Sequence, residues 1–287
     1  MPTVAALFWT MRPRQWTKNL FLFAGLVFTD NWSMLPVAAG GFVIFCCLSS
    51  GMYILNDVRD RERDRLHPAK RLRPIASGQL PIGLAVAAGL VLLLGGCAAS
   101  LAVNRSFAAI ALIFVGLQFA YTYALKQMVL LDVFAIAFAF VLRVVAGSAA
   151  ISVPNSVWLL VCTLEIALFM GFGKRRHEII ELIEQAGNHR TTLDHYSVPF
   201  LDQMISIVLG ALVVSYAVYA AASPTAASHP GLVYSLPFVM YGIFRYLYLI
   251  HMCNTGGSPE LIVLKDRPLQ VTLLLWLVFV IAALRFR

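Results

Sequence analysis

The sequence is poor in charged residues, which make up only 13% of its 287 positions. Soluble globular domains carry about 25% charged residues, so this composition excludes an ordinary soluble domain. A hydrophobic content of 60% and a mean hydropathy of +0.80 indicate a chain embedded in a membrane. The net charge of +8 therefore does not predict a nucleic-acid partner, because here the positions of the charges matter more than their sum.

Several signatures of soluble enzymes are also missing. The chain has no P-loop, no Gly-x-Ser-x-Gly elbow and no dinucleotide glycine fingerprint. Its five cysteines lack metal-ligand spacing, and His177, His189 and His195 do not form a zinc motif. These absences argue against nucleotide-binding, serine-hydrolase and zinc chemistry.

Long apolar stretches are abundant, and a bilayer-spanning helix needs about 17–25 such residues. The predicted spans are 19–36, 37–55, 81–102, 107–125, 129–151, 155–172, 200–222, 232–252 and 268–285. Asp30 and Asn31 interrupt the first of them. We therefore expect an all-α, multi-pass membrane protein of about nine transmembrane helices, with one domain over 1–287 and an interfacial amphipathic segment over 1–18.

Most of the 22 lysines and arginines fall on the amino-terminal side of these spans. Only Arg105, Arg285 and Arg287 fall on the opposite side. Because basic loops stay on the cytoplasmic side, this bias predicts a cytoplasmic amino terminus in the cell membrane. The predicted cytoplasmic loops are 56–80, 173–199 and 253–267.

A charged segment follows the second predicted span. Asn56, Asp57, Asp60 and Asp64 project at roughly 0°, 100°, 40° and 80° on a helix, which is a single arc. Carboxylates on one face repel one another unless a cation lies between them, so the spacing predicts a Mg²⁺ site. The basic run that follows would suit a phosphate bridged to that metal. That run consists of Lys70, Arg71 and Arg73.

Other basic residues near predicted helix ends have two interpretations each. They are either membrane-edge anchors or ligands of an anion, and they comprise Lys126, Lys174, Arg175, Lys265 and Arg267. The spacing of Lys174 and Glu178 predicts a helix that continues toward Gly187. Glu178 would form salt bridges on a solvated helix, or would position Lys174 and Arg175 toward a phosphate.

Charged residues inside the predicted spans need a separate explanation. Arg143 and Glu165 could form a buried structural pair, or Arg143 could line an interior cavity. Asp132 lies three helical turns before Arg143 and shares its face.

The aspartate motif Asn56-Asp57-x-x-Asp60-x-x-x-Asp64, followed by Arg71-x-Arg73-Pro74, resembles the first aspartate motif of the UbiA-type prenyltransferase superfamily. The resemblance covers essentially the whole chain and implies a UbiA-like helical bundle with an active-site cavity on the cytoplasmic side. That superfamily usually carries a second motif, D-x-x-x-D. Here Lys174-Arg175-Arg176-His177-Glu178 stands in its place, which argues against ordinary prenyl transfer to an aromatic acceptor.

One branch of the superfamily, the decaprenyl-phosphate phosphoribosyltransferases, is similar in further motifs. These are the segment from Arg12 to Asn19, the Lys-Arg-x-x-Glu form of the later loop, and Leu264-Lys265-Asp266-Arg267-Pro268. The branch implies transfer of 5-phosphoribose from phosphoribosyl diphosphate to a polyprenyl phosphate lipid, with release of diphosphate, in the synthesis of a cell-wall arabinan precursor.

The resemblance also implies roles for individual residues. Asn56, Asp57 and Asp60 would be catalytic, and Asp57, Asp60 and Asp64 would hold Mg²⁺ on the leaving diphosphate. The implied substrate-binding residues are Arg14, Lys18, Lys70, Arg71, Arg73, Tyr123, Lys126, Lys174, Arg175, Glu178, Lys265 and Arg267. The acceptor phosphate is already an anion, so no strong general base is required.

Two other functions are compatible with parts of the sequence. An intramembrane aromatic prenyltransferase, of the kind that makes quinone or haem precursors, would use the same aspartate motif for a prenyl diphosphate. A transporter or lipid flippase would use Arg143, Glu165 and Arg245 as its pathway. The polar residues lie on one side of the membrane instead of being distributed through it, which disfavours transport. Polyprenyl chain length and any homo-oligomer stay open.

Overall fold

A computed structural model of the chain describes residues 3–29, 31–68, 70–185, 195–252, 262–263 and 265–285. These residues form helices and connecting turns, with no strand among them. Their contacts divide the chain into two compact units. Unit 1 comprises Met1–Lys126 and Phe138–Asn155, and unit 2 comprises Gln127–Ala137 and Ser156–Arg287. The expectation of one domain over the whole chain stays a prediction.

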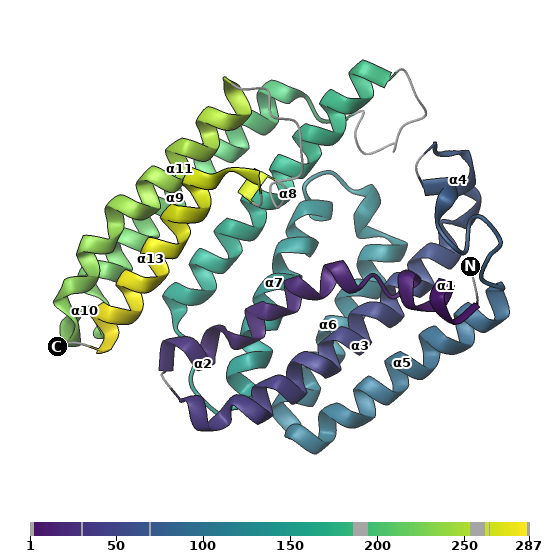
Figure 1. Cartoon of the computed structure of the whole chain (residues 1–287), viewed down its shortest axis with the longest axis horizontal. Helices are drawn as coiled ribbons and strands as arrows, with labels where there is room; N and C mark the ends of the chain where they lie inside the picture. The colour runs from purple at the N-terminus through teal and green to yellow at the C-terminus, as the bar shows by residue number, and fades with distance from the viewer. Residues whose placement is uncertain are drawn as a thin grey trace. The chain divides into compact units, whose positions relative to one another are not determined.

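Unit 1 is organised around α3 (Leu35–Arg59), which packs along α5 (Ile82–Val103) and contacts α6 (Arg105–Tyr123) (Figure 1). The amino-terminal segment lies against α3 through α1 and η1. The remaining elements are short, except for α7, whose first residues belong to unit 2. They are α1 (Thr3–Thr10), η1 (Pro13–Phe23), α2 (Ala24–Thr29), η2 (Trp32–Met34), α4 (Arg61–Leu66), η3 (Lys70–Leu72), η4 (Leu125–Gln127) and α7 (Leu131–Ala150).

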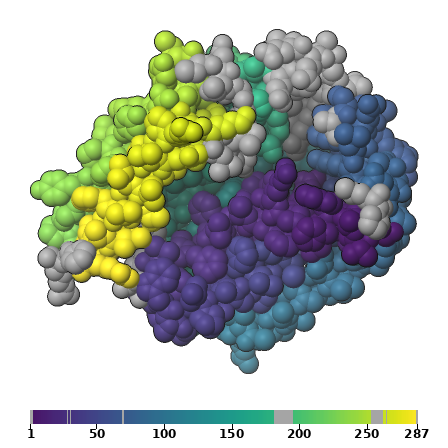
Figure 2. Space-filling view, viewed as in Figure 1, coloured from purple at the N-terminus to yellow at the C-terminus, as the bar shows by residue number. Residues whose placement is uncertain are grey.

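Unit 2 is built on the antiparallel helices α8 and α9, which form its largest interface, and α11 packs on both α9 and α13. In the space-filling view, the yellow α13 lies beside the green α11 (Figure 2). The elements are α8 (Val157–Gln185), α9 (Val198–Ala222), α10 (Pro224–Ser228), η6 (Pro230–Ser235), α11 (Leu236–His251) and α13 (Arg267–Arg285).

Within the described residues, eight helices are long and apolar enough to cross a membrane. Eight of the predicted spans each correspond to one of these helices. The predicted span at 19–36 differs, because η1, α2 and η2 divide it. Asn31 has φ −92° and ψ 59°, outside the helical region, and it immediately precedes η2. A polar interruption in the apolar stretch thus coincides with a break in the helix.

The predicted loops also need adjustment. Residues 56–59 belong to the last turn of α3 instead of to a loop, since that helix ends at Arg59. The helix predicted past residue 173 is confirmed as far as Gln185. Residues 186–194 and 253–261 lie outside the described residues.

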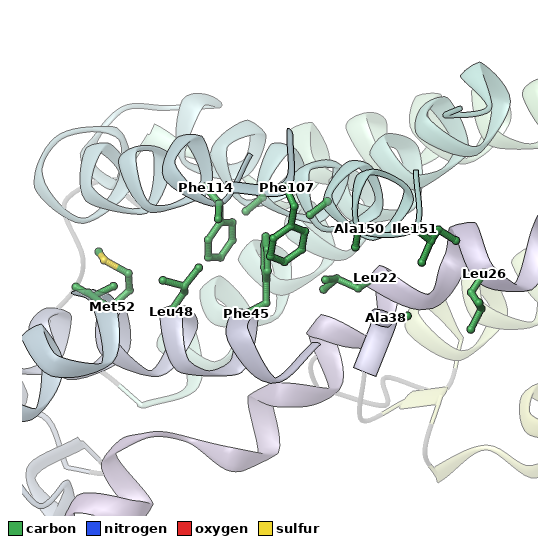
Figure 3. Packing of buried hydrophobic residues seen from close by; sticks show 14 residues of the cluster. Leu22, Leu26, Ala38, Phe45, Leu48, Met52, Phe107, Phe114, Ala150 and Ile151 are labelled. Carbon is green, nitrogen blue, oxygen red and sulfur yellow. The ribbon is translucent and has the colours of Figure 1, made fainter. Parts of the chain in front are cut away.

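The core of unit 1 joins its helices through aromatic side chains (Figure 3). Phe45 of α3 is fully buried between Phe107 and Phe114 of α6, with ring centroids 5.6 and 5.0 Å away. Leu22 of η1 and Leu48 of α3 extend the same cluster. Aromatic pairs at such distances add about 0.5–1.5 kcal/mol beyond their burial. The cluster therefore ties the amino-terminal segment, α3 and α6 into one unit.

The outer faces of the long helices are apolar, as expected for contact with lipid. Val91 and Leu94 of α5 and Leu274 of α13 are all more than 60% exposed. The purple amino-terminal segment lies on the surface of unit 1 (Figure 2). Its Phe8, Trp9 and Arg14 are exposed, and the interfacial role of this segment stays a prediction.

Gly147 of α7 allows η1 to approach closely, and this contact generates a test of the unit 1 packing. A Cβ at Gly147 would overlap the carbonyl oxygen of Leu22, which is backbone and has no rotamer to change. We expect Gly147→Ala to lower the free energy of unfolding by about 1–3 kcal/mol, measured by thermal unfolding of detergent-purified protein.

The matched control is Gly116→Ala on α6, where an added Cβ meets nothing within 4 Å. Equal melting temperatures for the two variants would contradict the close approach of η1 to α7.

Candidate active site

The end of α3 carries the predicted aspartate motif into a cluster of charges. Asn56 and Asp57 lie in the last turn of α3, Asp60 lies between α3 and α4, and Asp64 lies in α4. Asp57 and Asp64 are only 3% and 4% exposed. Carboxylates this deeply buried require compensating partners.

Two arginines supply the partners of the buried carboxylates. Arg73 Nη1 lies 3.1 Å from Asp57 Oδ1 and 2.7 Å from Asp64 Oδ2, so one nitrogen holds both acids. Arg12 Nη2 lies 2.5 Å from the same Oδ1 of Asp57. The Arg12 guanidinium also lies 5.2 Å from the ring centroid of Tyr53. Asp57 therefore contacts two guanidinium groups from different segments.

Sequence reasoning missed Arg12 as a site residue. It belongs to the Arg12-Pro13-Arg14 motif, of which only Arg14 is a predicted ligand, and Arg14 is exposed. Arg12 has a left-handed backbone, with φ 55° and ψ 61°, directly before η1. That conformation is uncommon for a residue other than glycine, and no local sequence signal indicates it.

Asp60 is held by Lys126 of η4, the short turn that follows α6. The Nζ atom of buried Lys126 lies 2.8 Å from both carboxylate oxygens of Asp60 and 3.3 Å from Asn56 Oδ1. Arg59 of α3 contacts the end of α6: its guanidinium group donates to the carbonyl oxygen of Thr122 and lies 4.3 Å from the Tyr123 ring centroid. The ends of α3 and α6 are thus joined twice, which positions Lys126 on the motif.

We call this set the aspartate cluster: Asn56, Asp57, Asp60, Asp64, Arg12, Arg73 and Lys126. Its three carboxylates face three cations. Among the described residues, no three His, Cys, Asp or Glu side chains are grouped so that they could hold a metal ion. Magnesium binding by Asp57, Asp60 and Asp64 therefore stays a prediction.

The donor chemistry of the aspartate cluster nonetheless fits Mg²⁺, which prefers carboxylate oxygens. Asp57 and Asp64 already direct oxygens at one shared cationic nitrogen, the Nη1 atom of Arg73. Asp60 instead faces Lys126. The residues that fit a metal best are therefore Asp57 and Asp64, with Asp60 next to them on the chain.

The other predicted phosphate ligands of unit 1 lie outside these ion pairs. Arg14, Lys70 and Arg71 are exposed, and Lys18 is half-buried. Their positions leave them accessible to an anionic ligand.

Unit 2 contains a second group of buried charges, which we call the Asp132–Arg175 cluster: Leu130, Asp132, Arg175, Glu178 and Tyr196. Asp132 is fully buried, and its carboxylate accepts hydrogen bonds from Arg175 Nε at 2.7 Å and Tyr196 Oη at 2.8 Å. Arg175 Nη1 also lies 2.5 Å from Glu178 Oε2. The guanidinium group of Arg175 thus bridges two carboxylates.

Tyr196 links this cluster to the start of α7. Its hydroxyl accepts a hydrogen bond of 2.6 Å from the Leu130 N–H, whose residue has a left-handed φ of 67°. Burial raises the pKa of Tyr196 to about 12.

The structure distinguishes among the predicted unit 2 ligands. Arg175 is 2% exposed and forms a salt bridge with Glu178 of the same helix, and a role of either residue toward a phosphate stays a prediction. Lys174, Lys265 and Arg267 are exposed. Arg245, which the sequence offers as part of a transport pathway, pairs with Asp266 at 2.8 Å. That contact holds the pKa of Asp266 below its usual range.

Arg143 and Glu165 belong to different units, and each has partners within its own unit, so their suggested pairing stays a prediction. Arg143 donates to Asn19 Oδ1 and to the carbonyl oxygen of Ala139, both at 2.7 Å. Its guanidinium group also lies over the Phe114 ring. Glu165 accepts a hydrogen bond from Ser215 at 2.9 Å. Arg143 is therefore a buried cation held by neutral groups of unit 1.

The Asp132–Arg175 cluster generates a stability prediction. Replacing Arg175 by Met leaves Asp132 buried without its cation, and breaking such a pair costs about 3–5 kcal/mol. We expect a large fall in the melting temperature of Arg175→Met and partial recovery in the double variant with Asp132→Asn. Lys174→Met, which removes an exposed neighbouring charge, serves as the control. A melting temperature for Arg175→Met equal to that of the control would contradict the pairing.

Comparison with known proteins shows which family this chain resembles. Residues 19–261 match the model of the UbiA prenyltransferase family. A decaprenyl-phosphate phosphoribosyltransferase from Mycolicibacterium smegmatis is 33% identical over 99% of this chain and 93% of that protein. The protein of the same name from Corynebacterium glutamicum is 32% identical over 95% of this chain and 85% of its own length.

Solved structures show the same fold at lower identity. A UbiA homologue from Archaeoglobus fulgidus bound to GPP and Mg²⁺ is 18% identical, with a TM-score of 0.74 and coverage of 98% of this chain and 99% of that one. A digeranylgeranylglyceryl phosphate synthase is 16% identical, with a TM-score of 0.70 over both full chains. The family match covers most of the sequence, including the aspartate motif that first suggested it. This chain therefore belongs to the UbiA prenyltransferase family.

Proposed function

We propose that this chain is a transferase that moves 5-phosphoribose from phosphoribosyl diphosphate to a polyprenyl phosphate, releasing diphosphate. The observation that carries the proposal is the identity of 32–33%, over nearly the full chain, to relatives named decaprenyl-phosphate phosphoribosyltransferases. The aspartate cluster supports it, since it combines acidic and guanidinium groups at one end of α3. Such a combination suits a diphosphate and its metal ion.

We propose that Asp57 and Asp64 bind Mg²⁺, with Asp60 beside them. Asn56 would orient the leaving diphosphate. When bound, Mg²⁺ supplies positive charge to the leaving diphosphate. Arg12 and Arg73 reach the same carboxylates and can donate to the diphosphate oxygens. Lys126 keeps Asp60 and Asn56 in place through its short contacts.

The chain offers cations for the remaining phosphates as well. We propose that the exposed Lys174 binds the ribose 5-phosphate together with Lys265 or Arg267. Arg175, which pairs with Glu178, would have a positioning role. Exposed Lys70 and Arg71 would add positive charge toward the donor. The acceptor phosphate is an anion that attacks without a general base.

Arg14 and Lys18 of the interfacial segment are our proposed ligands for the lipid phosphate, with Tyr123 at the end of α6 as a further contact. The proposed orientation places the amino terminus and the aspartate cluster on the cytoplasmic side of the cell membrane. A water-soluble donor reaches that surface from the cytoplasm, and a polyprenyl phosphate presents its headgroup at the same depth.

The transfer itself is tested with purified protein, Mg²⁺, labelled phosphoribosyl diphosphate and a polyprenyl phosphate. We expect label to appear in the lipid fraction and diphosphate to be released. A parallel reaction supplies a polyprenyl diphosphate and an aromatic acid. Prenylated aromatic acid in that reaction, with no labelled lipid in the first, would replace our proposal by an aromatic prenyltransferase.

The acidic ligands are tested by substitution. We expect Asp57→Asn to lower the transfer rate at least about 100-fold, because it removes a ligand of the Mg²⁺ whose positive charge would stabilise the departing diphosphate. Chelation of Mg²⁺ should stop transfer by the wild type. The control is Glu62→Gln on α4, whose side chain is 74% exposed, and its rate should stay close to that of the wild type. A rate for Asp57→Asn near that of this control would remove the proposed metal site.

A further inference from the structure

Every carboxylate of the aspartate cluster already has a cationic partner. Asp57 contacts Arg12 and Arg73, Asp64 contacts Arg73, and Asp60 contacts Lys126. Three negative charges thus face three positive charges, so the cluster presents little net charge to attract a divalent cation. A metal ion that binds alone must displace a guanidinium group that then has no new anionic partner.

The two sides of these ion pairs differ in burial. The side chains of Asp57 and Asp64 are 4% and 5% exposed, whereas those of Arg12 and Arg73 are 28% and 29% exposed. Removing one partner of a buried pair is costly because it leaves the other charge uncompensated. The carboxylates are therefore the fixed side of the pairs, and the arginines are the side with access to an incoming ligand.

We infer that this site takes the metal ion and the diphosphate only together, because Arg12 and Arg73 exchange Asp57 and Asp64 for the phosphate oxygens. The inference rests on the proposed function and names the species that the site binds: a divalent metal–diphosphate complex. In the exchange, the carboxylates gain the metal as their counter-ion and the arginines gain the phosphates. Each charge keeps a partner, so the cost of breaking the original pairs is offset.

Lys126 takes no part in this exchange. Its side chain is only 6% exposed, and it contacts both oxygens of Asp60 and the amide oxygen of Asn56. Arg59 holds the end of α6 from which Lys126 comes. The exchange is therefore confined to Arg12 and Arg73.

Arg12 becomes a diphosphate-binding residue under this inference. The competing explanation is structural: Arg12 would only attach the amino-terminal segment to α3, and Arg73 would only attach the segment after η3 to α3 and α4. The two explanations differ in what happens to metal binding when an arginine is removed. A structural residue, when lost, loosens the site and weakens binding, whereas an exchanging counter-ion, when lost, exposes carboxylates and strengthens binding of the bare metal.

The experiment measures Mn²⁺ binding to the full-length, detergent-purified protein by equilibrium dialysis, with and without inorganic diphosphate. For the wild type we expect diphosphate to increase metal affinity roughly tenfold or more, the factor that corresponds to one charge-assisted hydrogen bond. For Arg73→Gln we expect Mn²⁺ alone to bind roughly tenfold more tightly than to the wild type, by the same reasoning, and the gain from diphosphate to shrink.

The control is Arg63→Gln, which removes an exposed positive charge from α4 and should leave both affinities unchanged. Arg12→Gln is the second variant, because Arg12 contacts Asp57 and not Asp64, and a smaller change in the same direction is expected. Size-exclusion profiles show whether each variant is folded. If neither arginine variant folds, the wild-type comparison with and without diphosphate decides the matter.

Equal Mn²⁺ affinity of the wild type with and without diphosphate would overturn the inference. Weaker binding of Mn²⁺ alone to folded Arg73→Gln would do the same. These outcomes are separable from failure of the proposed function. Cooperative binding of metal and diphosphate without phosphoribosyl transfer would support the exchange and contradict phosphoribosyl diphosphate as the donor. Transfer without cooperative binding would support the proposed function and contradict the exchange.

Discussion

Burial of Asp57 at the end of α3 is the constraint on which the rest of unit 1 depends. An ionised carboxylate that is 3% exposed must have cationic partners, and here they come from segments far away in the chain. Arg12 attaches the amino-terminal segment to α3, and Arg73 attaches the segment that follows η3. The same charges that hold these segments together are the ones suited to a metal ion and a diphosphate. Under the proposed function, stability and ligand binding therefore share one set of groups.

Buried charge follows the same rule elsewhere in the chain. Arg143 donates hydrogen bonds to Asn19 Oδ1 and a backbone carbonyl oxygen, and Arg175 lies between Asp132 and Glu178. Each of these groups joins at least two segments of its own unit. In a chain with so few charges, a charged residue in an apolar helix is informative because leaving it unpaired is expensive.

Much of the fold could be predicted, because apolar length and helical periodicity are local properties. Eight predicted spans coincide with long helices, and the aspartate motif begins in the last turn of α3, at the end of the second predicted span. The prediction of one long helix over 19–36 is wrong, because η1, α2 and η2 occupy this stretch instead. Its shape depends on a close approach of Leu22 to Gly147, and a distant glycine leaves no signal in the segment itself.

The sequence by itself determined that the chain is membrane-embedded and that it resembles the UbiA family. The prediction that the four motif residues share one arc of a single helix is wrong, because α3 ends at Arg59 and Asp64 lies on α4. Tertiary structure alone decided which cation meets which acid. Arg12 and Lys126 stand 45 and 66 residues from the aspartates they contact, so their roles depend on packing between helices. Periodicity specifies the face on which a side chain lies, whereas the partner across that face is set by the fold of the rest of the chain.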